Sequence, residues 1–260
     1  MRLSNQCFAV TGLGYLPPWT VNAGFVTGQE RTLIIDAGAN AAAAATIYGY
    51  ASAVGPGNDL LVLNTERHFD HIGGNSWFRD LGLDIYGHAS IQRTAAEFLA
   101  EIEEFNGEIS NPARRALRES QVFYHNTRLA NPNCPITEDT RMDLGNCEIE
   151  ILLTPGHTPS NISVFVPADG VLFCADTLIN GYLPNLDAGT VDDWQVWLKS
   201  LDRIAELAPQ MIVPGHGPVA KGEEVPRLIA RVRQVLERAI AKGQSPTANC
   251  QEPTANRPSE

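Results

Sequence analysis

The chain of 260 residues is poor in features that would assign its class at once. No apolar run reaches 18 residues, so no segment is expected to span a membrane. The first residues carry no long apolar stretch of the kind a signal peptide needs. The cysteines include no Cys-x-x-Cys pair and have no framework spacing, which favours reduced thiols in a cytoplasmic protein. They are Cys7, Cys134, Cys147, Cys174 and Cys250.

Basic residues are also scarce. The sequence has 19 Lys and Arg against 30 Asp and Glu, a formal charge of −11. Binding to nucleic acid depends largely on Lys and Arg contacts to phosphate, so this balance argues against a nucleic-acid partner. We therefore expect a small-molecule substrate, with neither nucleic acid nor a membrane as partner. The pattern does not predict an oligomeric state.

The remaining composition is that of a folded domain with a large core, since 43% of the residues are hydrophobic. We expect a single domain over residues 1–243. The polar, proline-bearing residues 244–260 are predicted to form a disordered tail. Residues 89–135 have a helical pattern between two β regions and are interpreted as an insertion. This insertion could be a lid over a site or a surface helical hairpin that only packs.

Apolar periodicity and Gly/Pro punctuation predict the main elements. Strands are expected at 7–10, 23–27, 32–36, 60–64, 148–153, 163–166, 171–175 and 211–213. Outside the insertion, helices are expected at 39–54, 191–207 and 223–241. Within it, apolar residues recur at helical spacing from Ile91 to Phe105, and a second helix is expected at 112–120.

The densest cluster of reactive side chains follows the predicted strand at 60–64. Two carboxylates and two imidazoles fall within six residues: Glu66, His68, Asp70 and His71. Buried charges and ring nitrogens are unfavourable unless something pairs with them, and a divalent metal is the simplest partner. The spacing suits a turn that wraps around a site, since ligands on one helix face would recur every three or four residues.

Potential metal ligands also follow three other predicted strands. They are His157 after 148–153, Asp176 after 171–175 and His216 after 211–213. Strand ends at one edge of a sheet assembly lie close in space, so seven ligand-type side chains could surround one cleft. Gly156 and Gly215 precede the two isolated histidines and would supply tight turns.

Other candidate sites are weak. The sequence has neither a Gly-x-Ser-x-Gly elbow nor a phosphate-binding loop. Cys174 is interpreted as a packing residue, and Trp194 and Trp197 as part of an apolar helix face. Tyr182 follows Asp176 closely enough to line a substrate pocket. His88 and His125 have no identifiable partners and are interpreted as structural.

The succession Glu66-x-His68-x-Asp70-His71, His157, Asp176 and His216 resembles the signature of the metallo-β-lactamase superfamily. The resemblance implies an α/β (α+β) fold, a four-layer αββα sandwich with a two-metal site at one edge. It assigns Glu66, His68 and His157 to a first metal, and Asp70, His71 and His216 to a second, with Asp176 bridging them. Glu66 departs from the family pattern, which has histidine there.

The implied cofactors are two divalent ions. Zinc suits mixed His and carboxylate ligation, while the carboxylate of Glu66 makes manganese or iron more favourable than in an all-histidine site. A single occupied site is also compatible with this ligand set.

The implied enzyme is a binuclear metallohydrolase. Two metals about 3.5–4 Å apart can hold a hydroxide and lower the pKa of water from 15.7 towards ~7. This hydroxide would cleave a small ester, thioester, lactone or amide, β-lactams included. Asp70 is the candidate catalytic residue that orients the nucleophile or moves a proton. Two alternatives stay open: a mononuclear iron oxidoreductase acting on sulfur compounds such as persulfides, and a metal-binding protein without catalysis.

Overall fold

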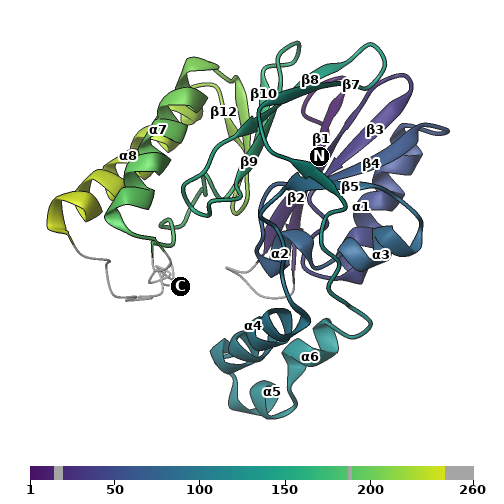
Figure 1. Cartoon of the computed structure of the whole chain (residues 1–260), viewed down its shortest axis with the longest axis vertical. Helices are drawn as coiled ribbons and strands as arrows, with labels where there is room; N and C mark the ends of the chain where they lie inside the picture. Colours follow the sequence, from purple (N-terminus) through teal and green to yellow (C-terminus); the bar gives the residue numbers. More distant parts are fainter. Residues whose placement is uncertain (15–19, 187–188, 244–260) are drawn as a thin grey trace, which may run out of the picture.

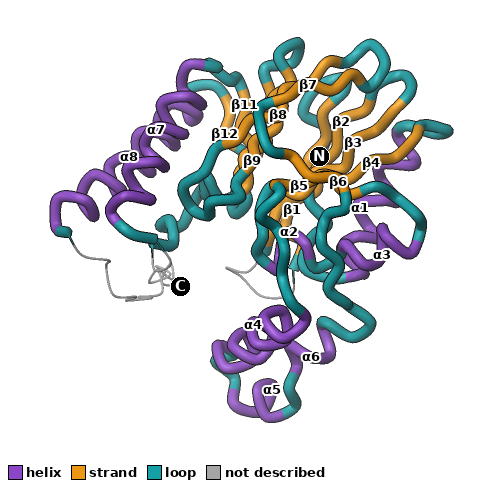
Figure 2. Tube along the Cα trace, viewed as in Figure 1, coloured by secondary structure: helices purple, strands orange, loops and turns teal. Residues whose placement is uncertain are grey.

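The computed structural model describes residues 1–14, 20–186 and 189–243, and the predicted tail at 244–260 lies outside these residues. Two six-stranded sheets lie face to face, and helices cover the outer face of each (Figures 1 and 2). The predicted αββα sandwich is confirmed. None of the described helices is long and apolar enough to cross a bilayer.

The first sheet contains the N-terminal half of the strands in chain order. β1 pairs with β2 and β2 with β3 in antiparallel fashion, whereas β3, β4, β5 and β6 are parallel neighbours. The strands are β1 (Cys7–Leu13), β2 (Val21–Thr27), β3 (Arg31–Ile35), β4 (Asp59–Asn64), β5 (Ile85–His88) and β6 (Cys134–Ile136).

The second sheet has the order β12-β11-β10-β9-β8-β7. Only the β10–β11 pair of these strands is parallel, and the helix α7 (Val191–Glu206) supplies its crossover. The strands are β7 (Thr140–Asp143), β8 (Glu148–Leu153), β9 (Ile162–Val166), β10 (Val171–Ala175), β11 (Met211–Pro214) and β12 (Ala220–Lys221).

Alternating side chains of the strands divide the apolar core into layers. In β10, Val171 and Phe173 pack between the sheets, while Leu172 and Cys174 pack under the outer helices. This division follows from the two-residue period of a strand. The burial of Cys174 on the helix side supports its interpretation as a packing residue.

Four helices form the outer layers. α1 (Ala41–Val54) and α3 (Asn75–Asp80) pack on the first sheet, and α7 (Val191–Glu206) and α8 (Glu224–Lys242) pack on the second. α7 begins with a capping box, in which Thr190 and Asp193 bond each other's backbone and side chains. Its buried face includes Trp194 and Trp197, as expected for an amphipathic helix.

The segment between β5 and β6 forms three helices below the sandwich in Figure 1. They are α4 (Ala95–Glu108), α5 (Pro112–Ala116) and α6 (Glu119–Phe123). The single helix predicted at 112–120 was wrong, because Arg118 adopts a left-handed conformation with φ of 54° and separates α5 from α6.

Candidate metal centre

The seven predicted ligand side chains come together at one edge of the sandwich. The loop after β4 supplies Glu66 and His68, and the short helix α2 (Phe69–Ile72) continues it with Asp70 and His71. The second sheet supplies the others from the segments after β8, β10 and β11: His157, Asp176 and His216. Ligands from both sheets therefore meet across the sandwich.

These side chains form two groups, within each of which one ligand atom per residue lies within 4.8 Å of the others. The first group is Glu66, His68, His157 and Asp176, and the second is Asp70, His71 and His216. Asp176 also faces the second group, since its Oδ2 lies 3.4 Å from His216 Nε2 and 3.5 Å from His157 Nε2. Asp70 Oδ2 lies 3.2 Å from His216 Nε2.

The donor atoms fit metal ions because several are buried without a hydrogen-bond partner among the described residues. They are both carboxylate oxygens of Glu66, His71 Nε2 and Asp176 Oδ1. Buried polar atoms are nearly always hydrogen-bonded, and these atoms have only ion-pair contacts with other ligand side chains. Imidazole nitrogens and carboxylate oxygens are ligands of zinc and of other divalent transition metals, so cations here would satisfy these atoms.

The charges of the site perturb its ionisable groups in opposite directions. Burial opposes the charge of His68, but the Glu66 carboxylate outweighs it and raises the pKa of His68 to about 9. Burial likewise opposes the charge of Asp70, yet His71 and His216 lower its pKa to about 2. Without metal, the carboxylates are thus balanced by protonated imidazoles.

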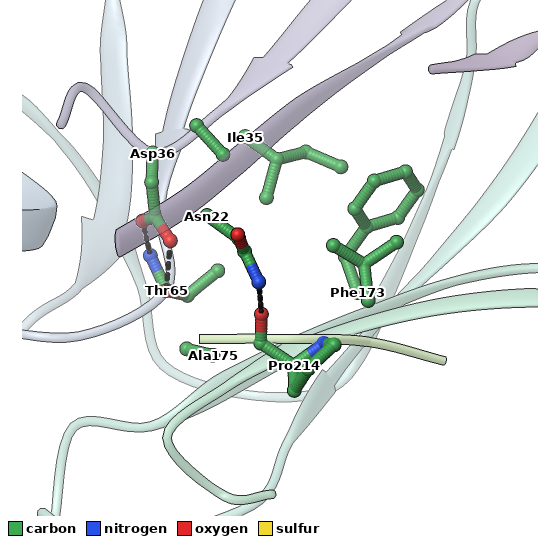
Figure 3. A pocket seen from close by; sticks show the side chains of 9 residues that line it. Asn22, Ile35, Asp36, Thr65, Phe173, Ala175 and Pro214 are labelled. Carbon is green, nitrogen blue, oxygen red and sulfur yellow. Dashed lines mark hydrogen bonds between the residues drawn. The ribbon is translucent and has the colours of Figure 1, made fainter. Parts of the chain in front are cut away.

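Asp36, at the end of β3, orients His71. Its Oδ2 lies 2.9 Å from His71 Nδ1. The same oxygen accepts a hydrogen bond from the Thr65 hydroxyl, and Oδ1 accepts one from the Thr65 backbone N–H (Figure 3). The hydrogen bond to Asp36 leaves His71 Nε2 directed at the other ligands. A carboxylate behind a metal-binding histidine fixes the ring orientation and raises its basicity.

His216 is held by the backbone and by Asn22. Its Nδ1 lies 3.0 Å from the carbonyl oxygen of Thr20. The Asn22 amide donates to the carbonyls of Pro214 (Figure 3) and Gly217, on either side of the histidine. The loop after β11 is therefore tied to β2 in the facing sheet.

Trp197 of α7 supports His157. The two ring centroids lie 5.6 Å apart, and the indole donates to the Thr177 carbonyl. A Cβ on Gly156 would lie 2.3 Å from the Trp197 ring, and a Cβ on Gly215 would lie 1.8 Å from Asp176 Oδ1. Both glycines are required by close approach, not by positive φ as a tight turn would demand.

The sequence pattern did not single out Asn22, and it gave Asp36 and Trp197 no role at the site. An acidic residue at a strand end was the available signal for Asp36, whereas Trp197 and Asn22 contact the site only through the tertiary fold. Tyr182 is 38% exposed, two residues after Asn180, whose N–H donates to the His216 carbonyl. Its predicted place in a substrate pocket stays a prediction.

Comparison with known proteins identifies the family. The family model described as the metallo-β-lactamase superfamily matches residues 16–216. The chain belongs to this superfamily. Among solved structures, a metallo-β-lactamase family protein from Thermus thermophilus superposes with a TM-score of 0.68 and 20% identity, over 93% of this chain and 82% of that one. At that identity the likeness shows the shared fold.

Curated relatives of this superfamily member are similarly distant. A probable metallo-hydrolase from Bacillus subtilis (strain 168) is 26% identical over 212 residues, which cover 76% of this chain and 80% of the relative. An acyl-coenzyme A thioesterase from Gallus gallus is 26% identical over 218 residues, covering 80% and 76% respectively. The chain is thus a member of a metallo-hydrolase superfamily.

Proposed function

We propose that this protein is a metal-dependent hydrolase of small acyl esters, with thioesters as the favoured class. The supporting observation is that two groups of potential metal ligands lie side by side. They contain buried carboxylate oxygens that make no hydrogen bond among the described residues. Divalent ions held there would supply a nucleophile from water and polarise the substrate carbonyl. The named relative that acts on acyl-coenzyme A supports the thioester class.

The roles of the chain's own residues follow from their positions. Glu66, His68 and His157 would hold one ion, Asp70, His71 and His216 the other, and Asp176 would contact both. His68 is the most exposed ligand, with 32% of its side chain accessible, so substrate would approach from its side. Asp70, which is buried beside His216, would orient a water molecule and move a proton.

Elemental analysis combined with a substrate panel tests this proposal. Protein purified without a metal-affinity tag is expected to contain up to two divalent ions per chain. It should hydrolyse an acyl-coenzyme A or S-lactoylglutathione in preference to homoserine lactone and nitrocefin. Asp70→Asn should lower kcat by at least a hundredfold, whereas the exposed Asp59→Asn, at the start of β4, should leave it unchanged.

The proposal fails if no substrate in the panel is cleaved after zinc, manganese or iron has been added back. Iron content together with oxygen uptake on a persulfide would instead indicate the oxidoreductase. Metal binding that raises thermal stability without any turnover would indicate a binding protein.

A further inference from the structure

Glu66 belongs to the first ligand group and also contacts His71 of the second group. It is 0% exposed, and among the described residues its carboxylate oxygens make ion-pair contacts with ligand imidazoles but no hydrogen bond. Its Oε2 faces the first group, 2.8 Å from His68 Nδ1 and 3.8 Å from His157 Nε2. Its Oε1 faces the second group, 3.4 Å from His71 Nε2. One carboxylate therefore presents a different oxygen to each group.

Asp176 likewise contacts both groups, from the opposite sheet. Its Oδ1 lies 3.6 Å from His71 Nε2, and its Oδ2 lies 3.5 Å from His157 Nε2. Both carboxylates thus approach the same two imidazoles, one of each group. A histidine in place of Glu66 could direct only one ring nitrogen at the site, because its two nitrogens point in divergent directions.

We infer that Glu66 bridges the two metal positions, with Oε2 on the first ion and Oε1 on the second, as a second bridging carboxylate beside Asp176. This inference rests on the proposed metal centre and concerns how that centre is built. It makes Glu66 a ligand of both ions, where the family resemblance assigns this position to the first ion alone.

Two consequences follow from a doubly bridged centre. Loss of the Glu66 bridge removes a ligand from both ions at once, so the affinities of the two positions are linked. The centre also contains three carboxylates, Glu66, Asp70 and Asp176, and oxygen donors shift preference towards manganese and iron relative to a site with an additional imidazole.

Metal titration of matched variants tests the bridge. Metal-free native protein and variants are titrated with zinc and with manganese, and the stoichiometry and each dissociation constant are measured. His157→Ala removes a ligand of the first group only, and it should retain one ion with an affinity within threefold of the native second position. Glu66→Asp keeps the charge but shortens the side chain, and it should weaken the ion held by Asp70, His71 and His216 by at least tenfold.

A second substitution of Glu66 guards against a folding defect in Glu66→Asp. Glu66→His restores a ligand to the first ion but cannot bridge, so two ions should bind with the second at least tenfold weaker than in native protein. Circular dichroism of the metal-free variants checks that each is folded. The bridge is refuted if Glu66→Asp or Glu66→His holds the second ion as tightly as His157→Ala does.

The bridge and the proposed function fail in different ways. Native protein that hydrolyses nothing but loses second-site affinity on Glu66→Asp would disprove the activity and retain the bridge. If the native protein turns over substrate but Glu66→Asp weakens only the first ion, the activity is retained and the bridge is disproved. Native protein that binds no divalent ion would overturn both.

Discussion

At the scale of single residues, Asp36 illustrates how a side chain outside the ligand set controls the site. Replacing it with Asn removes the carboxylate that holds His71 Nδ1 and the Thr65 backbone. Loss of such a partner lowers metal affinity by about 10–100-fold. We expect this loss for Asp36→Asn in a competition titration against a chromophoric chelator. Asp59→Asn, on the exposed start of the next strand, should bind metal as the native protein does.

Gly215 offers a steric test of the same site. A Cβ at this position would lie 1.8 Å from Asp176 Oδ1, so Gly215→Ala must displace the carboxylate or the loop. We expect it to abolish binding of at least one ion, measured by elemental analysis after dialysis. Gly49→Ala is the matched control, because its Cβ meets no atom and α1 should gain up to about 1 kcal/mol. Equal metal content in the two variants would contradict the steric argument.

At the scale of elements, the sequence correctly predicted the strands that are followed by potential metal ligands. The apolar runs before Glu66, His157, Asp176 and His216 are strands in the structure, and their ends converge because all four reach the same edge. Short elements were not predicted: α2, where a turn was expected, and α3, β5, β6, β7 and β12. Their sequences are too short for periodicity to distinguish them, and pairing with neighbouring strands determines the four strands among them. The break at Arg118 likewise has no signal in the sequence.

The helical insertion packs directly against the metal-binding loop. Phe69 stands between His68 and Asp70. The centroid of its ring lies 5.8 Å from that of Phe105 and 5.7 Å from that of Tyr124. Arg93 donates to the Arg67 carbonyl and forms an ion pair with Glu101 of α4. These contacts connect the insertion to the loop, so it stabilises the ligands, whether or not it also acts as a lid.

Phe69→Ala tests this connection. Truncating a large apolar side chain costs about 3–5 kcal/mol when it is fully buried, and Phe69 is half-buried. We therefore expect a loss of about 2–3 kcal/mol in the free energy of unfolding, measured with urea, and weaker metal binding. Leu99, in α4, is 63% exposed, so Leu99→Ala should change neither quantity. Unaltered metal affinity in Phe69→Ala would show that the insertion does not support the ligand loop.

At the scale of the whole molecule, metal binding should stabilise the sandwich because the ligands come from both sheets. Ions that bind only the folded chain stabilise it by about 4 kcal/mol at a thousandfold excess over Kd. For a chain of this size, that corresponds to a rise in Tm of roughly 8–16 °C. Scanning calorimetry of metal-free and reconstituted protein checks the difference. An unchanged Tm would mean that the ligands do not hold metal across the sheets.

Proton release on metal binding follows from the charge balance of the metal-free site. The pKa of His68 is raised to about 9, and the pKa values of His71 and His216 lie well above their usual value. The protonated imidazoles stabilise the metal-free fold fully below pH 6.5, and the contribution of His68 is lost as the pH rises through its folded-state pKa of about 9. Metal ions require neutral imidazole, so binding at pH 7 must displace these protons.

Metal affinity is therefore expected to increase between pH 7 and 9 while the stability of the metal-free protein decreases. Calorimetric titrations at pH 7 in two buffers of different ionisation enthalpy measure the protons released, and more than one per chain is expected. His125→Gln, outside the ligand groups, should release the same number. If the heat of binding does not depend on the buffer, the imidazoles are already neutral, and carboxylate charge in the metal-free site must be balanced in another way.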